Sequence, residues 1–294
     1  MASRPKRRRR NPPTEPTSEA PSVSTSQQVE DLVHSCVTNL LPTVEATCRQ
    51  IILAHLQNTS TPPANATSTS VSFPEEGSIN HYIPKDLCTV QYQSIHTATE
   101  IIQKMGKGAL IAKTDLENAY KQIPIHPDDF ELLGFMFDNQ FYFDKTLPFG
   151  LSFACNLFEK FSTALQWMLT EKLGVQHCVH ILDDFLFIGP PNSSECYSSL
   201  LAFHVLAKDL GLPIKSEKTV YPCTSLTFLG LELDTVRFEV RLPEDKLHQL
   251  KLEIQSFQLK RSATLQELQS LIGKLNFACN VVPPGRTFLR RLIN

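Results

Sequence analysis

The chain has 294 residues, 41% of them hydrophobic, which is long enough for one or two domains with a proper core. Its 28 Lys and Arg against 30 Asp and Glu give a formal charge of −2, and no apolar run is long enough to span a bilayer, so we expect no membrane partner. The eight scattered cysteines include no C-x-x-C pair, which excludes metal-finger spacing and fits a reducing intracellular compartment.

Residues 1–26 form a basic tail that we expect to be disordered, because they hold almost nothing to bury. Six of the first ten residues are Lys or Arg, so the rest of the chain has 22 basic residues against 30 acidic ones. Two interpretations of Lys6–Arg10 stay open: a nuclear import signal or polyanion-binding tail, and a solvated basic tag. The expected location is therefore the nucleus or the cytoplasm.

Residues 27–57 are predicted to form two helices, because apolar residues recur there at helical spacing and Pro42 interrupts them. Amphipathic helices outside a core usually pack on a partner or on their own copy, so we expect self-association through this segment. Residues 58–72 follow as a polar linker rich in Ser, Thr and Pro.

The globular part is predicted to begin near Phe73 and to mix helices with antiparallel strands. Helices are expected at 98–105, 153–169, 195–210, 244–258 and 265–278; strands at 109–114, 227–233 and 237–241; and hairpins at 134–143 and 180–189. Thr264 and Glu267 form a capping-box pattern at the start of the last helix. This order predicts an α+β fold rather than a doubly wound parallel sheet.

Three aspartates stand where an unpaired carboxylate is costly. Asp183 and Asp184 interrupt the apolar stretch His180–Gly189, and Asp115 ends the strand-like run that begins at Ala109. Burying a carboxylate without a partner is strongly unfavourable, and a divalent cation is the usual compensation. The pattern therefore predicts a Mg²⁺-dependent phosphoryl-transfer site in which these aspartates are the catalytic and metal-binding residues.

Five motifs in chain order resemble those of reverse transcriptases. They are Lys113–Tyr120 (KTDLENAY), Leu147–Ser152 (LPFGLS), Ile181–Asp184 (ILDD), Leu210–Lys218 (LGLPIKSEK) and Leu226–Gly230 (LTFLG), the last similar to the primer-grip hairpin. Over residues 71–294 the chain most closely resembles the reverse transcriptases of vertebrate tyrosine-recombinase retrotransposons of the DIRS and Ngaro kind.

The resemblance implies a right-hand polymerase fold, with a palm and residual fingers at 73–243 and a helical thumb at 244–294. It also implies an RNA-directed DNA polymerase that extends a DNA primer with deoxynucleoside triphosphates on an RNA or DNA template. Two Mg²⁺ ions would be held by Asp115, Asp183 and Asp184. Asp184 is expected to be the supporting ligand, because neighbouring strand residues point to opposite faces.

The resemblance also assigns three residues to the nucleotide site. Tyr120 lies where the family closes off the 2′ side of the sugar, which would select deoxynucleotides; the alternative is an ordinary core aromatic. Gly150 is expected to form a tight turn that lets the backbone approach the incoming base pair. Phe149 stands where some relatives carry Gln, so its contact would be apolar.

Charged residues complete the predicted site. Lys218 matches the family's lysine that neutralises or protonates pyrophosphate, with Lys215 as its competitor, and Ser152 is expected to cap the helix that follows it. Five thumb side chains would hold duplex phosphates in contacts that weaken with salt: Lys246, Lys251, Lys260, Arg261 and Lys274.

The chain departs from the family near its start, where relatives carry longer fingers with an arginine that grips the triphosphate. Residues 58–80 contain no Lys or Arg, and no ribonuclease H or recombinase segment is expected after Asn294. Two functions stay open: a polymerase core with reduced fingers, and a catalytically inactive retrotransposon-derived remnant that binds nucleic acid or protein. The three aspartates favour the first, and the missing clamp favours the second.

Overall fold

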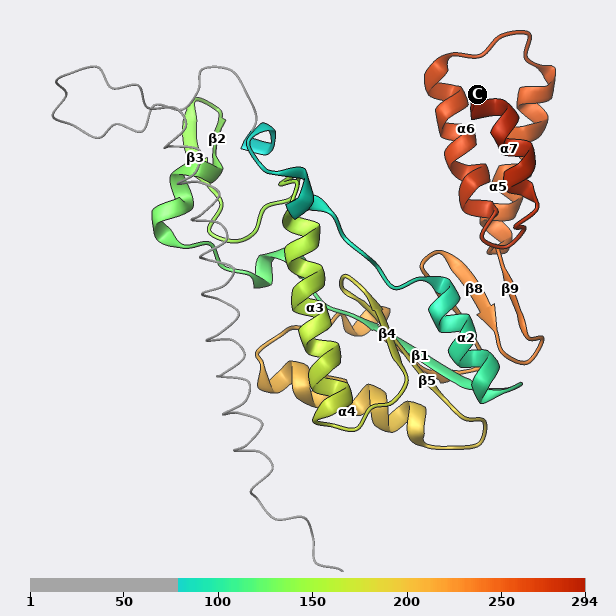
Figure 1. Cartoon of the computed structure of the whole chain (residues 1–294), viewed down its shortest axis with the longest axis horizontal. Helices are drawn as coiled ribbons and strands as arrows, with labels where there is room; N and C mark the ends of the chain where they lie inside the picture. Colours follow the sequence, from blue (N-terminus) through green and yellow to red (C-terminus); the bar gives the residue numbers. More distant parts are fainter. Residues whose placement is uncertain (1–78, 294) are drawn as a thin grey trace, which may run out of the picture. The chain divides into compact units, whose positions relative to one another are not determined.

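The computed structural model describes residues 79–293 (Figure 1). Helices and antiparallel sheets alternate along this part, which confirms the α+β class. The predictions for the basic tail, the paired helices and the linker, residues 1–72, lie outside the described residues. None of the helices within 79–293 has the length and apolar character needed to cross a membrane.

The α-helices in the described part agree closely with the sequence patterns. They are α2 (Ile95–Met105), α3 (Ala154–Glu171), α4 (Glu195–Asp209), α5 (Glu244–Leu259), α6 (Leu265–Ala278) and α7 (Gly285–Ile293). The capping box is confirmed, because the Glu267 amide donates to Thr264 Oγ1 at 3.2 Å and the Thr264 amide donates to Glu267 Oε2 at 2.9 Å. Helix α7 is not among the predicted elements.

A four-stranded antiparallel sheet, with strand order β4-β5-β1-β6, carries the predicted aspartates. Its strands are β1 (Leu110–Asp115), β4 (Cys178–Ile181), β5 (Asp184–Gly189) and β6 (Val220–Cys223). Strand β6 is missing from the sequence prediction. It contains Pro222, which a sheet tolerates at an edge, and β6 is the edge strand beside β1.

The two faces of this sheet are covered by different elements. Phe185 and Phe187 of β5 pack against Phe203 of α4, with ring centroids 4.5 and 5.7 Å apart. Leu186 and Ile188 alternate to the opposite face, where they join a buried cluster with residues of α2, β7 and β8. The helices α3 and α4 run alongside the sheet in Figure 1, and both contact its strands. Both faces of β5 are therefore buried.

The remaining strands form two smaller sheets. They are β2 (Gly134–Phe137) with β3 (Gln140–Phe143), and β7 (Ser225–Phe228) with β8 (Leu231–Asp234) and β9 (Glu239–Arg241). The first pair confirms the predicted hairpin. The single strand predicted at 227–233 is wrong: Leu229 and Gly230 have φ of +50° and +77°, so the chain reverses there and makes the hairpin β7–β8.

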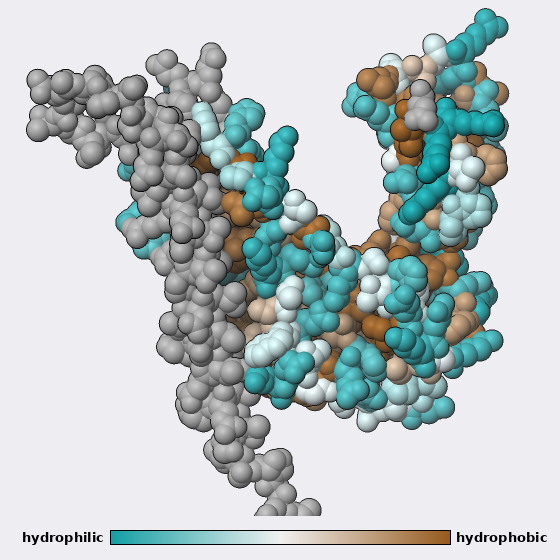
Figure 2. Space-filling view, viewed as in Figure 1, coloured by the Kyte–Doolittle hydropathy of each residue, from teal (hydrophilic) through white to brown (hydrophobic). Residues whose placement is uncertain are grey.

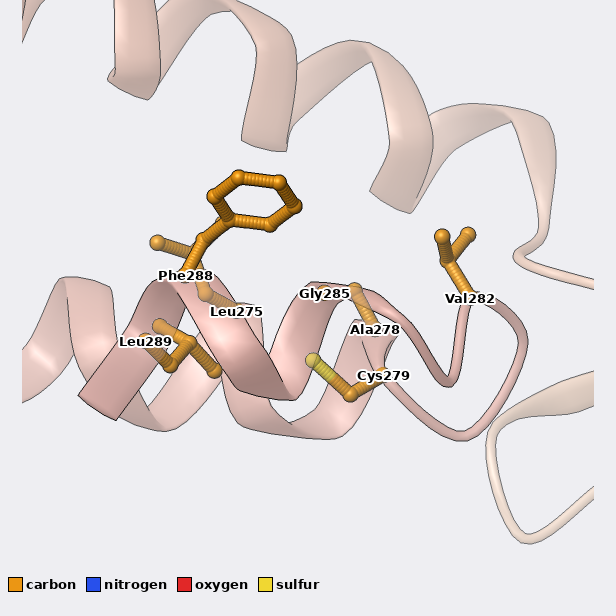
Figure 3. Close-up of a pocket in the computed structure, with 7 residues that line it drawn as sticks. All are labelled: Leu275, Ala278, Cys279, Val282, Gly285, Phe288 and Leu289. Atoms are coloured by element: carbon orange, nitrogen blue, oxygen red, sulfur yellow. The ribbon is translucent and has the colours of Figure 1, made fainter. Parts of the chain in front are cut away.

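The C-terminal helices α5–α7 carry hydrophobic side chains on their surface, at the upper right of Figure 2. Figure 3 shows an apolar pocket between α6 and α7, lined by Leu275, Ala278, Cys279, Val282, Gly285, Phe288 and Leu289. Gly285 allows α7 to begin close to α6, because a side chain there would meet Cys279 Sγ at 3.1 Å. The pocket has no carboxylate, amine or imidazole, so the candidate chemistry lies elsewhere.

Candidate active site

The structure brings the three predicted aspartates together at one end of β1 and β5. In the antiparallel register of these strands, Asp115 lies directly opposite Asp184. The next residue of the chain, Leu116, donates its amide to the Asp183 carbonyl at 3.1 Å. Asp115 is buried, with 4% of its surface exposed. The strands β1 and β5 and the turn before β5 thus bring three aspartates to one end of the sheet.

Asp183 lies in a two-residue turn. Ile181 of β4 pairs with Asp184 of β5, so only Leu182 and Asp183 connect the strands. Leu182 has φ of +53°, a left-handed conformation that favours glycine and is unfavourable for leucine. Because Asp183 is a turn residue, strand alternation does not separate it from Asp184. That reason for ranking Asp184 as the supporting ligand therefore fails, and the role of each aspartate stays a prediction.

Burial and mutual repulsion disfavour the charged forms of Asp183 and Asp184 at this end of the sheet. Burial raises the pKa of Asp183, and the nearby Asp115 carboxylate raises it further. Burial also raises the pKa of Asp184, with added repulsion from Asp183 and Asp115. Both shifts mean that the ionised forms are costly in this setting. A site of this kind is stabilised by positive charge.

Lys218 supplies one positive charge. Its Nζ lies 2.5 Å from Asp115 Oδ2, and this hydrogen bond raises the pKa of Lys218. The competing Lys215 contacts Asp115 through its backbone, with its amide donating to the Asp115 carbonyl at 3.0 Å. Of the two lysines, Lys218 is the one whose ammonium forms an ion pair with Asp115, while the charges of both lysines lower the pKa of Asp183.

The fit of this site to a divalent cation can be judged from its donors. Within residues 79–293, no three His, Cys, Asp or Glu side chains converge as they would around a bound ion. One of the carboxylates, that of Asp115, is ion-paired with the ammonium of Lys218. The backbone arrangement nevertheless suits Mg²⁺, which prefers carboxylate oxygens, because Asp115 and Asp184 face each other across paired strands. The residue types and the strand register therefore fit the predicted metal, while the side-chain positions do not form a metal site in the described residues.

Tyr120 lies within an aromatic cluster. Its ring packs edge-on against Phe149 and Phe158, at centroid distances of 5.0 and 5.2 Å, and its hydroxyl lies 3.1 Å from Cys155 Sγ. Burial raises the pKa of Tyr120, and repulsion from Asp183 contributes to the same shift. The phenol is therefore neutral and within electrostatic reach of the turn. Phe149 is 73% exposed and offers an open apolar surface beside it.

The segment before α3 forms the predicted tight turn. Gly150 has φ of +90°, and its carbonyl accepts a hydrogen bond from Asn80 Nδ2 at 2.8 Å. The Ser152 amide donates to Asn80 Oδ1, also at 2.8 Å. The prediction that Ser152 caps the helix is wrong: α3 has Phe153 at its N-cap, and the Ser152 hydroxyl is buried without a hydrogen-bond partner in the described part of the chain.

Two further residues at the site are absent from the sequence prediction. Glu159 of α3 accepts a hydrogen bond from the Leu182 amide, and His180 of β4 lies beside Glu159. Both side chains are buried. The sequence pattern that could have indicated Glu159 is a stripe of polar residues at helical spacing, next to the apolar face of α3: Cys155, Glu159, Thr163 and Gln166.

Comparison with known proteins matches this geometry to a family. The family model described as "Reverse transcriptase (RNA-dependent DNA polymerase)" matches residues 35–233. The genome polyprotein of Petunia vein clearing virus is 25% identical over 207 residues, which is 70% of this chain and 9% of that protein. Protein P of a duck hepatitis B virus is 26% identical over 164 residues, 55% of this chain and 20% of that protein. The chain spans less than a third of these relatives.

Solved structures with the same fold come from a foamy virus. Its protease–reverse transcriptase in complex with double-stranded DNA has a TM-score of 0.55 and 22% identity, over 73% of this chain and 34% of that one. A second structure of that protein with double-stranded DNA has a TM-score of 0.53 and 16% identity, over 90% of this chain and 64% of that one.

Proposed function

Because the chain belongs to the reverse transcriptase family, we propose that it is an RNA-directed DNA polymerase core. It transfers deoxynucleotides to the 3′-hydroxyl of a DNA primer on an RNA or DNA template. The observation that carries this proposal is the register that pairs Asp115 with Asp184 and hydrogen-bonds Leu116 to Asp183. In this proposal residues 73–243 act as the palm and residues 244–294 as the thumb.

Asp115, Asp183 and Asp184 would hold two Mg²⁺ ions at the end of β1 and β5. The chemistry supplied there is a lowered pKa of the primer hydroxyl and stabilisation of charge on the leaving pyrophosphate. Lys218 would neutralise the pyrophosphate or give it a proton, and its ion pair with Asp115 supports this role. The raised pKa values of Asp183 and Asp184 support a site built to receive positive charge.

The proposed partners are template, primer and deoxynucleoside triphosphates. The basic side chains of α5, α6 and the segment between them would contact duplex phosphates, and the foamy virus structures were solved with double-stranded DNA. Lys260 and Lys274 now pair with Glu267 and Glu253, so their phosphate contacts would replace ion pairs. The motif order supports a source among DIRS- and Ngaro-like retrotransposons.

Primer extension tests the proposal. We expect the purified full chain, given Mg²⁺, a primed RNA or DNA template and deoxynucleotides, to lengthen the primer, and we expect EDTA to stop it. Product formation is measured on a denaturing gel. Extension no greater than that of the Asp183→Asn variant would contradict the proposal. Template binding without extension would then support the inactive nucleic-acid-binding remnant.

Tyr120→Ala is expected to lower discrimination against ribonucleotides by about 10–100-fold, the range of a steric difference of a few atoms in a packed site. The ring, held by Phe149 and Phe158, would no longer occupy the space beside the sugar. The measurement is the ratio of kcat/KM for a deoxynucleotide and its ribonucleotide. Tyr120→Phe keeps the ring and is expected to keep the ratio. Equal ratios in the Ala and Phe variants would show that the ring is only part of the core.

A further inference from the structure

A buried carboxylate forms a hydrogen bond with the turn that carries Asp183. Glu159 Oε2 accepts a hydrogen bond from the Leu182 amide at 2.8 Å. Leu182 is the residue whose left-handed backbone is unfavourable for a side chain. The hydrogen bond to a charged acceptor is stronger than one to a neutral group. It therefore stabilises the turn at the residue where its conformation is most costly.

His180 lies beside this carboxylate. Its Nε2 lies 3.4 Å from Glu159 Oε1, and its Nδ1 lies 2.5 Å from Gln166 Oε1. Gln93 completes the network: its Nε2 donates to Gln166 Oε1 at 3.0 Å, and its Oε1 accepts from the His180 amide at 2.8 Å. Side chains from β4, α3 and the segment before α2 thus fix the strand that leads into the turn.

Packing alone does not explain a glutamate at this place. Its side chain is buried and hydrogen-bonded to the residue next to Asp183. A further buried negative charge is costly, and an apolar side chain of the same size would fill the space without that cost. What Glu159 offers instead is an acceptor aimed at the turn.

We propose that Glu159, oriented by His180, is a positioning residue for the catalytic turn. It fixes the peptide of Leu182 and so the direction in which Asp183 presents its carboxylate to cations. Glu159 is not assigned contact with reacting atoms, because one of its oxygens accepts from the turn and the other faces the imidazole of His180 at 3.4 Å. This inference rests on the proposed function of Asp183 and deepens it.

Mn²⁺ binding to the purified full chain tests the inference without catalysis. The free-ion signal in electron paramagnetic resonance gives the dissociation constant. Glu159→Met keeps the volume and removes the acceptor, and we expect binding to weaken about 10-fold or more, as for other residues that orient metal ligands. Glu159→Gln keeps an acceptor oxygen and is expected to stay within about threefold of the wild type.

The matched control is Ser162→Ala. Ser162 lies on the same helix, is fully buried, and its hydroxyl has no hydrogen-bond partner in the described part of the chain. We expect unchanged Mn²⁺ binding. Should Glu159→Met fail to fold, His180→Phe serves as the second variant, because it keeps the stacking on Phe185 but removes the ring nitrogens. We expect it to weaken Mn²⁺ binding about three- to tenfold, which tests the same positioning role.

Primer extension separates this inference from the function on which it rests. For Glu159→Met we expect kcat to fall about 10–100-fold with little change in the KM for deoxynucleotide. Extension by the wild type with equal kcat and Mn²⁺ affinity in a folded Glu159→Met variant would overturn the positioning role alone. If Glu159→Gln were as impaired as Glu159→Met, charge rather than the acceptor would matter, which also overturns it. Mn²⁺ binding that depends on Glu159, without any extension, would support positioning and overturn the polymerase.

Discussion

Asp183→Asn is expected to lower the rate of primer extension by about a thousandfold or more. The amide has nearly the shape of the carboxylate but lacks its charge, so it holds a cation poorly. Metal ions contribute several kcal/mol of transition-state stabilisation, and a loss of about 4 kcal/mol corresponds to this factor. The measurement is the single-turnover rate of adding one deoxynucleotide at saturating substrate.

Asp209→Asn is the matched control for this change. Asp209 ends α4 on the exposed surface of the protein, and the same change of charge there is expected to leave the rate within about twofold. A rate for Asp183→Asn within tenfold of the wild type would contradict the assignment of Asp183 as a metal ligand.

Asp183→Asn lowers activity but is expected to keep or raise the stability of the fold. Burial and the Asp115 carboxylate raise the pKa of Asp183, so its charge is unfavourable in the folded protein. Removing that charge should leave the melting temperature in EDTA equal to or above that of the wild type. Added Mg²⁺ should raise the melting temperature of the wild type more than that of the variant. Loss of activity would then come with no loss of fold.

Phe203→Ala is expected to lower the free energy of unfolding by about 3–5 kcal/mol, a large share of a typical domain's stability. Phe203 is 1% exposed and packs against Phe185 and Phe187, so its removal leaves a cavity between α4 and β5. Because Asp184 begins β5, primer extension should fall at temperatures where the variant unfolds. Urea unfolding followed by circular dichroism measures the change.

Leu201→Ala provides the comparison on the same helix. Leu201 is 49% exposed, so truncating it removes fewer buried contacts and should cost less than about 1 kcal/mol. Equal losses for the two variants would mean that the α4–sheet contact is not a main source of stability.

Elements with a strong local signal could be predicted from the sequence. The periodic apolar face of α3 and the capping box of α6 give their helices to within two residues. Strand β6 has no such signal, since four residues with a proline form a strand only because β1 offers an open edge. The reversal at Leu229 and Gly230 lies within an apolar run, and alternation alone cannot distinguish a strand from a tight hairpin there.

The part of the candidate site that could be predicted is the part whose residues are unusual for their place in the sequence. Aspartates within apolar strands are rare enough to indicate a function, and the structure brings Asp115, Asp183 and Asp184 together. Glu159 and His180 were not predicted, because their roles arise from a contact between α3 and a turn more than twenty residues away. A hydrogen bond to a backbone amide depends on the fold and has no motif of its own.

Asp115 and Asp183 are anchored in different ways, and this bears on which ion sizes the site tolerates. Asp115 ends a strand held on both sides, whereas Asp183 belongs to a loop of two residues, each with two soft torsions. Oxygen ligands lie about 2.0–2.1 Å from Mg²⁺ but about 2.3–2.6 Å from Ca²⁺. Room for the larger radius would have to come from backbone rotations at Leu182 and Asp183, which the hydrogen bond from the Leu182 amide to Glu159 restrains.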